Sequence, residues 1–290
     1  PPGGPHAEIV AMNAARDGGS DVRGATLYST LEPCSHTGRT GPCTDAIISA
    51  GIACVVAAIA DPDSHVAGTG FDALRAAGIE VVTDVLTDEV SAQLAPYLHH
   101  RRTGRPFVML KMATTLDART AIPNGPRWIT GEEARVRVHQ LRAESDAIVV
   151  GAGTVVADNP ELTVRHVEGA SPRRIVLSRS GSISAIAKVQ PCDVWSGSLE
   201  DLLDSLGGEG VLQLMVESGA TVATAFHEQG LINRYVLHIA PIVSGSDSAP
   251  GVFVGADALP LSDCSLVSAT ALGADIEIVL DPIRKKVGTS

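Results

Sequence analysis

Three potential metal ligands and one carboxylate near the start of the chain constrain its fold more than any other feature. His6 and Glu8 are separated by a single residue, and Pro33-Cys34 and Cys43 follow, with eight residues between the two cysteines. One histidine and two thiolates fill three positions of a tetrahedral zinc site and leave the fourth position for water. The chain must therefore fold so that three segments, far apart in the sequence, meet around one ion.

The same residues indicate a hydrolytic zinc site. Zinc lowers the pKa of a bound water molecule toward ~7, and Glu8, which is not needed as a ligand, can carry the proton of this water to a departing amine. The order His-x-Glu, Pro-Cys, Cys resembles the signature of the cytidine-deaminase-like enzymes. That signature has a shorter spacing between its cysteines. In the longer loop here, Gly38 and Gly41 give the backbone freedom, and Pro42 can begin the next helix.

Two other interpretations of these residues stay open. The three ligands can be ordinary residues in a coincidental order, or the site can be purely structural, with His36 as a fourth ligand. A structural site would leave Glu8 without a role. Because residues i and i+2 of a regular helix do not share a face, we expect His6 just before, or in the first turn of, a helix over residues 7–16.

Length and composition predict a soluble enzyme of two domains. The chain has 290 residues, more than the usual size of a single core, and no apolar run approaches the ~20 residues needed to cross a membrane. Five cysteines, an odd number with two placed at the metal, favour a reducing, cytoplasmic compartment. The first five residues contain neither the basic nor the apolar region typical of an export signal.

Charge favours a small substrate over a nucleic acid. Residues 1–103 contain six arginines, no lysine and twelve acidic residues, and the whole chain has a formal net charge of −11. A polynucleotide would be repelled, since proteins that bind one carry a basic face. Arg39, the single cation of the loop between the cysteines, could hold one phosphate group beside the metal, or could be an ordinary solvated residue.

Apolar runs alternate with helical patterns along residues 1–103, which indicates a βαβ arrangement with a largely parallel sheet. The expected strands are residues 25–30, 53–59 and 79–83, and the expected helices are residues 44–50, 70–77 and 88–98. The charged, glycine-containing stretch from His99 to Pro106 breaks this pattern. We therefore predict one domain over residues 1–103 and a second over residues 104–290.

The second segment also reads as α/β, and three of its expected strands end in glycine or hydroxyl turns. The turns are Gly151 to Thr154 after strand 147–150, Ser178-Arg179 after strand 174–177, and Glu217-Ser218-Gly219 after strand 211–216. At such strand ends, backbone amides and a helix N-terminus can hold a pyrophosphate, although the first turn is not a complete GxGxxG motif. Ser178 and Arg179 suit a ribose 2′-phosphate. A hairpin of residues 265–270 and 276–280 predicts a mixed sheet.

A series of motifs extends along nearly the whole chain. They are, in order, His6-Ala7-Glu8, Glu32 to Cys43, Lys111 to Asp117, Trp128-Ile129-Thr130, Gly153-Thr154-Val155, Asp158-Asn159-Pro160, Leu162 to Arg165 and Glu217-Ser218-Gly219. In this order they resemble the motifs of the bifunctional riboflavin-biosynthesis deaminase-reductases, in which the loop between the cysteines is also extended. The resemblance implies a cytidine-deaminase-like three-layer domain followed by a dihydrofolate-reductase-like domain. It also implies zinc and NADPH, deamination of a diamino-ribosylaminopyrimidinone 5′-phosphate, and reduction of the ribosyl group to ribityl.

The resemblance further implies roles for individual residues. The zinc ligands correspond to His6, Cys34 and Cys43, and the proton shuttle corresponds to Glu8. The positions that contact NADP are Ala113, Trp128, Thr154, Asp158, Ser178 and the turn from Gly219 onward. The positions that hold the pyrimidine substrate are Arg142, Leu162, Arg165 and Glu217, and Lys111 falls near the sugar.

The chain departs from this family at its start and in two internal stretches. A strand and a helix normally precede His-Ala-Glu, and the regions after Asn124 and around residues 180–196 are short. A protein without these segments would have only a working reductase, so a reductase with an N-terminal scaffold is one rival interpretation. A zinc-stabilised binding module without turnover is the other. Whether the protein is a homo-oligomer is left open.

Overall fold

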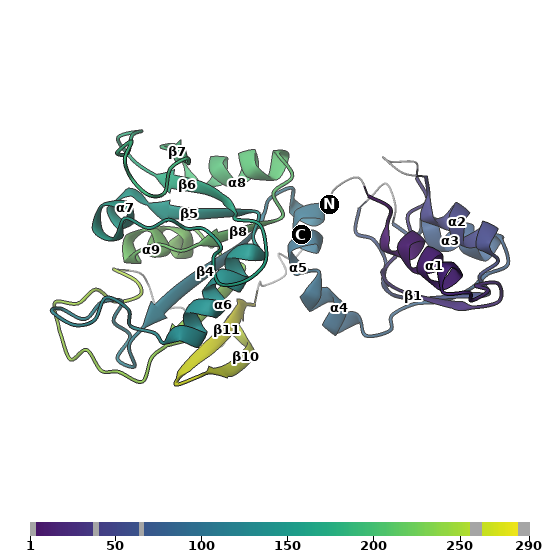
Figure 1. Cartoon of the computed structure of the whole chain (residues 1–290). Helices are drawn as coiled ribbons and strands as arrows, with labels where there is room; N and C mark the ends of the chain where they lie inside the picture. The colour runs from purple at the N-terminus through teal and green to yellow at the C-terminus, as the bar shows by residue number, and fades with distance from the viewer. Residues whose placement is uncertain (1–3, 37–40, 64–66, 256–262, 284–290) are drawn as a thin grey trace. The chain divides into compact units, whose positions relative to one another are not determined.

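The computed structural model describes residues 4–36, 41–63, 67–255 and 263–283. The chain forms two compact units, Pro1–Thr103 and Gly104–Ser290, which are called the N-terminal unit and the C-terminal unit below (Figure 1). Each unit has its own sheet and its own buried apolar clusters.

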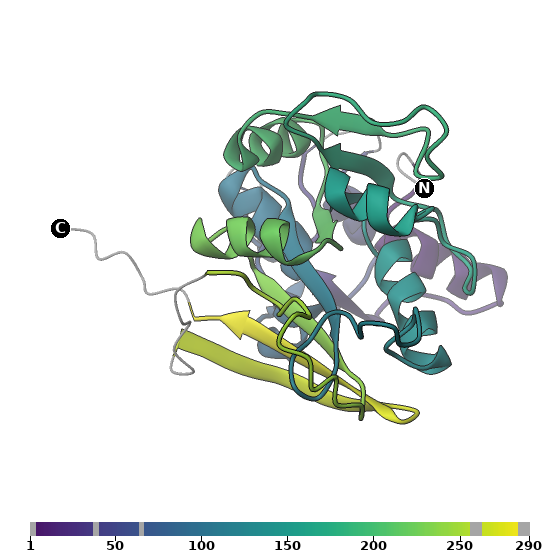
Figure 2. The ribbon, with the colours of Figure 1, turned by 90° about the vertical axis from the view of Figure 1, so that its left-hand side faces the viewer.

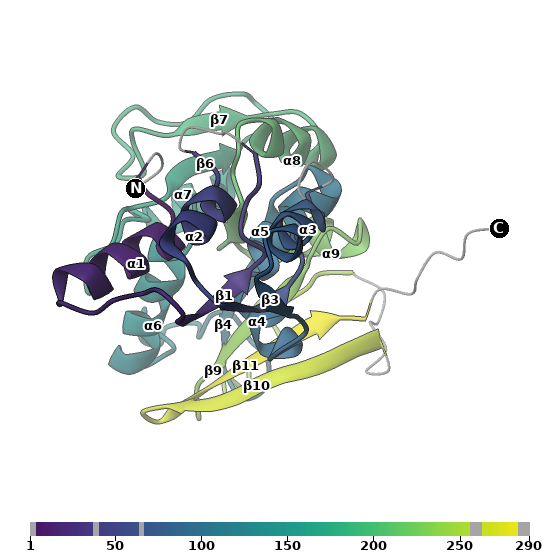
Figure 3. The same ribbon diagram turned by 90° about the vertical axis from the view of Figure 1, so that its right-hand side faces the viewer.

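The N-terminal unit is built on a parallel three-stranded sheet, as the alternating pattern predicts. Its strand order is β1 (Thr26–Leu31), β2 (Cys54–Ile59), β3 (Glu80–Val82). The helices are α1 (Ala7–Asp17), α2 (Cys43–Ala50), α3 (Thr69–Ala76), α4 (Thr87–Gln93) and α5 (Ala95–Thr103). The helices α1 and α2 lie side by side (Figure 3).

Two apolar clusters fix the layers of this unit. Met12 of α1, Ile47 of α2 and Leu74 of α3 pack with Leu27 and Val55 of the sheet. A second cluster joins residues of β2 to α4 and α5. Helices on both sides of one sheet give the three-layer arrangement expected of a cytidine-deaminase-like unit.

The end of the N-terminal unit differs from the prediction. The sequence pattern predicts one helix over residues 88–98 and a break from His99, whereas the structure has two helices and α5 continues to Thr103. Pro96 has no backbone N–H and cannot join the preceding turn, so the helix restarts beside it. The charged residues do not end α5. The helix ends just before Gly104, whose φ of +74° does not fit a right-handed helix.

The C-terminal unit contains an eight-stranded mixed sheet. Its strand order is β10-β11-β9-β4-β8-β5-β6-β7, and all neighbours are parallel except β10 with β11 and β11 with β9. The strands are β4 (Phe107–Thr114), β5 (Ala147–Gly151), β6 (Arg173–Leu177), β7 (Asp193–Trp195), β8 (Gln213–Val216), β9 (Arg234–Ile239), β10 (Cys264–Leu272) and β11 (Asp275–Pro282). Figure 2 shows the hairpin of β10 and β11 at one edge of this sheet, as the sequence pattern predicts.

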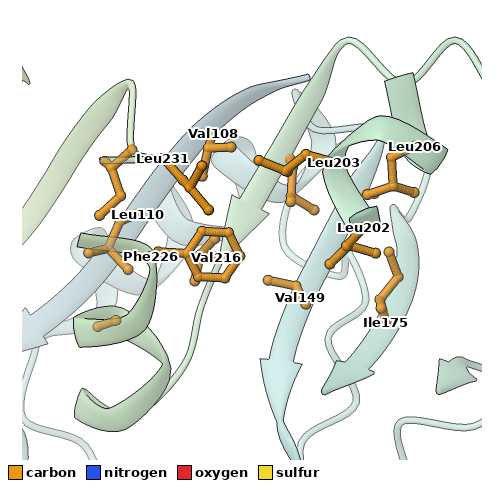
Figure 4. Close-up of a cluster of buried hydrophobic side chains, with 14 of the residues drawn as sticks. Val108, Leu110, Val149, Ile175, Leu202, Leu203, Leu206, Val216, Phe226 and Leu231 are labelled. Atoms are coloured by element: carbon orange, nitrogen blue, oxygen red, sulfur yellow. The ribbon is translucent and has the colours of Figure 1, made fainter. Parts of the chain in front are cut away.

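Helices cover both faces of this sheet, and alternate residues of β4 face different clusters. The helices are α6 (Glu132–Ala143), α7 (Ala152–Asp158), α8 (Leu199–Gly208) and α9 (Ala220–Glu228). Val108 and Leu110 pack with Leu202 of α8 and Phe226 of α9 (Figure 4). Met109 instead packs in the cluster that holds α6. Because the neighbouring strands from β9 to β7 are all parallel, their carboxyl ends share one edge of the sheet, where ligands of such folds bind.

Helices of the described residues are all too short or too polar to span a membrane.

Candidate active sites

His6, Cys34 and Cys43 converge in the N-terminal unit. Their ligand atoms lie within 4.8 Å of one another, and the His6 Nδ1 is 3.2 Å from the Cys43 sulfur and 3.5 Å from the Cys34 sulfur. His6 lies in extended conformation just before the first residue of α1, as expected, so it does not have to share a helix face with Glu8. Cys43 is the first residue of α2. One imidazole and two thiols form a donor set that suits zinc. His36 is exposed and does not belong to this group.

The N-terminus of α2 holds Cys34 in place. The backbone N–H of Cys43 donates to the Cys34 sulfur at 3.3 Å, and the N–H and hydroxyl of Thr44 donate to the Cys34 carbonyl oxygen at 3.2 and 3.3 Å. Burial raises the pKa of the Cys43 thiol, and the charge of Glu8 raises it further. Glu8 is half-buried in the first turn of α1, two residues after His6.

Glu32, the first residue of the motif that contains both cysteines, is a buried anchor whose role the sequence does not indicate. Its side chain is 3 % exposed, and its carboxylate accepts four backbone hydrogen bonds. The donors are the N–H groups of Asp61 (3.2 Å), Gly68 (2.9 Å), Gly70 (2.8 Å) and Phe71 (3.3 Å). Glu32 thus ties the end of β1, just before Cys34, to the start of α3.

In the C-terminal unit, two of the predicted turns are joined. The strands β5 and β8 are neighbours, and the N–H of Gly151 donates to the Ser218 hydroxyl at 2.8 Å. The N–H of Gly219 lies 3.3 Å from the Thr154 hydroxyl oxygen, to which it donates. The starts of α7 and α9 are therefore side by side. Ala113 lies half-buried near the end of β4, which is also next to β8.

The Ser178 hydroxyl is less available to a ligand than the sequence indicates, because it is hydrogen-bonded within its own turn. The Ser178 hydroxyl donates to the carbonyl oxygen of Ser182 at 2.8 Å and lies 3.0 Å from the Ser180 hydroxyl. The Ser178 N–H donates to the Trp195 carbonyl oxygen of β7. Arg179 is exposed. The guanidinium is thus the group of this turn that extends toward solvent, while the serine hydroxyl shapes the turn.

Trp128 and Asp158 are linked through Arg127. Trp128 is 60 % exposed, and the guanidinium carbons of Arg127 and Arg135 lie 5.2 and 5.9 Å from the centre of its ring. Arg127 also donates to the backbone carbonyl oxygen of Asp158 at 2.9 Å. The structure therefore brings these two predicted cofactor residues to the same place, at the end of α7.

A charged cluster links three of the predicted substrate and sugar residues. Arg142 of α6 donates two hydrogen bonds of 2.9 Å to Glu217 and a third, of 3.1 Å, to the carbonyl oxygen of Thr163. Burial lowers the pKa of Lys111, and the Glu217 charge opposes this shift. Burial acts to raise the pKa of Glu217, but Arg142 and Lys111 lower it more, so it lies below its ordinary value. Glu217 is thus held as a carboxylate.

The remaining predicted substrate residues lie in the loop after α7 or between the cysteines. Leu162 is 3 % exposed and has a φ of +54°, an uncommon conformation for a leucine. Arg165 is exposed and pairs with Glu161 at 2.7 Å. Arg39 lies outside the residues that the structure describes.

Two further residues have contacts that the sequence does not indicate: Asp117, which the sequence gives only as the last residue of a motif, and His139. The Asp117 carboxylate accepts hydrogen bonds from the Thr115 hydroxyl and from the backbone N–H groups of Ser244 and Gly245, which joins the loops after β4 and β9. His139 is buried on α6. Local patterns could not have found the Ser244 and Gly245 partners, because these are backbone groups distant in the sequence, whereas the Thr115 hydroxyl lies only two residues from Asp117.

Known proteins resemble the chain along most of its length. Residues 106–278 match the RibD C-terminal domain, and residues 2–59 match the zinc-binding region of cytidine and deoxycytidylate deaminases. The riboflavin biosynthesis protein RibD of Escherichia coli (strain K12) is 36% identical, with 85% of this chain and 77% of that protein aligned. RibD of Mycobacterium tuberculosis (strain H37Rv) is 40% identical, over 84% of this chain and 74% of that protein.

Two solved structures share the fold of both units. Acinetobacter baumannii RibD, form 1, superimposes with a TM-score of 0.87 at 34% identity and covers 98% of this chain and 87% of its own. A diaminohydroxyphosphoribosylaminopyrimidine deaminase / 5-amino-6-(5-phosphoribosylamino)uracil reductase from Thermotoga maritima has a TM-score of 0.87 at 34% identity, over 97% of this chain and 86% of its own.

Proposed function

Because this chain belongs to the RibD family of bifunctional deaminase-reductases in riboflavin biosynthesis, we propose that its two units act in turn on one pyrimidine ribotide. The N-terminal unit removes the 2-amino group of 2,5-diamino-6-ribosylamino-4(3H)-pyrimidinone 5′-phosphate. The C-terminal unit then reduces the ribosyl group of the product to ribityl with NADPH. The convergence of His6, Cys34 and Cys43 beside Glu8 is the observation that carries the first step.

In the N-terminal unit, His6, Cys34 and Cys43 would hold zinc, and Glu8 would move protons. Bound zinc supplies the chemistry of lowering the pKa of water so that it attacks at neutral pH. Glu8 accepts a proton from the attacking water and gives it to the amino nitrogen as the C–N bond breaks, so that ammonia leaves and a carbonyl remains. Glu32 keeps the Cys34 loop in position through its four backbone hydrogen bonds.

In the C-terminal unit, the joined turns of β5 and β8 would bind the NADPH pyrophosphate. NADPH supplies the hydride that reduces the sugar. The cofactor residues that we propose are Ala113, Trp128, Thr154, Asp158, Ser178, Arg179 and Gly219. The substrate residues that we propose are Arg142, Leu162, Arg165 and Glu217, with Arg39 in the deaminase unit. Arg142 keeps Glu217 charged and oriented, and Lys111 lies beside this pair.

One experiment tests both steps. The protein is incubated with the diaminopyrimidinone phosphate, with and without NADPH, and separately with the deaminated ribotide and NADPH, and both ammonia and the nicotinamide absorbance are followed. We expect ammonia in both samples of the diaminopyrimidinone phosphate and NADPH oxidation that follows its release. NADPH oxidation that occurs only with the already deaminated substrate, without ammonia release, would instead favour a reductase with an N-terminal scaffold.

A further inference from the structure

His139 lies on α6, three residues before Arg142 and therefore on the same face of the helix. Its side chain is only 5 % exposed, so its ring nitrogens need partners within the protein. The His139 Nδ1 accepts a hydrogen bond from the backbone N–H of Arg165, at 3.3 Å. A buried side chain of α6 is thus bonded to the main chain of a proposed substrate residue.

This hydrogen bond fixes the protonation of the imidazole. A nitrogen that accepts a hydrogen bond carries no proton, so the neutral ring has its proton on Nε2. Burial, followed by the charges of Arg142, His166 and Arg165, lowers the pKa of His139 to about 4, although Glu217 opposes the shift. The ring therefore remains an acceptor at neutral pH.

Two residues of α6 bond to the backbone of the loop after α7, at Thr163 and at Arg165. Arg142 donates to the carbonyl oxygen of Thr163, while His139 accepts from the N–H of Arg165. The two backbone groups that α6 bonds thus belong to residues two apart in this loop. Between them, the N–H of Val164 bonds to the Ser171 hydroxyl, at 3.0 Å. The backbone of three successive loop residues is therefore held by side chains of α6 and by Ser171.

The backbone geometry determines where the Arg165 side chain lies. The Arg165 guanidinium donates to the Thr163 hydroxyl at 2.8 Å and to the Glu161 carboxylate at 2.7 Å, so its position depends on the path of the loop backbone from Glu161 to Arg165. A planar guanidinium binds a phosphate well only when its orientation is fixed. A change in the backbone dihedrals of Arg165 would change the direction in which this side chain leaves the main chain.

We propose that His139 is a positioning residue, which holds the backbone of Arg165 so that its guanidinium meets the phosphate group of the ribotide. The proposal rests on the function proposed above for Arg165. His139 itself does not touch the substrate. Its contribution is an acceptor at Nδ1, and any side chain that places an acceptor there should replace it.

Two polar variants of the full-length protein test this role. In His139→Asn the amide oxygen can occupy the place of Nδ1, whereas in His139→Gln the amide reaches the place of Nε2. With the deaminated ribotide as substrate, we expect His139→Gln to raise the KM of the reductase about tenfold, the effect of losing one well-oriented charged contact. We expect the KM of His139→Asn for the ribotide to stay within about threefold of the parent value. The kcat and the KM for NADPH should be unchanged in both variants.

The variant Arg165→Ala completes the experiment. We expect Arg165→Ala by itself to raise the KM for the deaminated ribotide. The double variant of Arg165→Ala with His139→Gln should have a KM no higher than that of Arg165→Ala alone. An unchanged KM in Arg165→Ala would refute the assignment of Arg165 to the substrate. An increase in Arg165→Ala without one in His139→Gln, equal effects of Asn and Gln, additive effects in the double variant, or a general loss of NADPH binding would each overturn the role of His139 alone.

Discussion

At the scale of single residues, Glu8 gives the sharpest test of the deaminase site. Glu8→Gln keeps the size of the side chain but cannot accept and deliver a proton. We expect ammonia release to fall by about 10²–10⁴-fold, while zinc content and reductase activity stay at the parent level. Metal analysis, ammonia release and NADPH oxidation with deaminated substrate measure the three quantities. In the matched variant Cys43→Ala, metal and ammonia release should be lost together. Unchanged deamination in Glu8→Gln would remove the proposed mechanism.

Arg179 is expected to select the cofactor. It is exposed beside the turn that Ser178 shapes, and the segment Ser178-Arg179-Ser180 contains no acidic residue that could bind a ribose hydroxyl. Arg179→Ala should raise the KM for NADPH roughly ten- to a hundredfold and leave the KM for NADH nearly unchanged, because only NADPH has the 2′-phosphate. Steady-state kinetics with both cofactors measures this. Equal losses for both would show that Arg179 supports the fold or the pyrophosphate site.

The residues that the sequence identified are those whose chemistry is local to a motif. His6, Cys34 and Cys43 stand out because zinc sites are commonly built from histidine and cysteine side chains, and the structure brings the three together. Glu32 and His139 could not be recognised, since their partners are backbone N–H groups that only the folded chain places beside them. The sequence therefore predicts reactive groups better than it predicts the groups that orient them.

At the scale of elements, α3 packs so closely on the Cys34 loop that Gly70 has no room for a side chain. An added Cβ would overlap the carbonyl oxygen of Pro33. We expect Gly70→Ala to displace this loop and to lower zinc affinity or deaminase activity about 10–100-fold, as do changes in the groups that support metal ligands. Gly41→Ala is the matched control, because an added Cβ there meets no atom within 4 Å. Equal zinc retention in both variants would contradict the importance of this contact.

The helix α8 makes a similar close contact with Gly104, in the segment just before β4. A Cβ at Gly207 would overlap the carbonyl oxygen of Gly104, whereas a Cβ at Gly208 meets no atom within 4 Å. We expect Gly207→Ala to lower the free energy of unfolding by about 1–3 kcal/mol through overpacking. Gly208→Ala should leave it unchanged or raise it by up to about 1 kcal/mol, since alanine favours helix. Chemical denaturation of both variants measures the difference, and equal stability would show that α8 can shift away.

The predicted elements agree best with the structure where apolar periodicity is strong. The strands β2 and β5 occur within one residue of their expected positions, and both are largely buried apolar runs. The strands β1 and β6 also begin and end within one residue of their predictions, although only part of each is buried. The short strand β7 carried no such signal, because its three residues are only half-buried or exposed. The helix α5 extended beyond its prediction because charged residues end a helix less effectively than glycine or proline.

At the scale of the whole molecule, the metal ligands and the proposed cofactor residues lie in different units with separate cores. We therefore expect a chelator to abolish ammonia release and leave NADPH oxidation with deaminated substrate unchanged. A ligand that binds only the folded state stabilises that state, so removing zinc should lower the unfolding temperature of the N-terminal unit. Calorimetry should show two transitions, of which only one moves on chelation and returns with added zinc. Loss of both activities, or a single transition that shifts as a whole, would show instead that the two units fold and act as one.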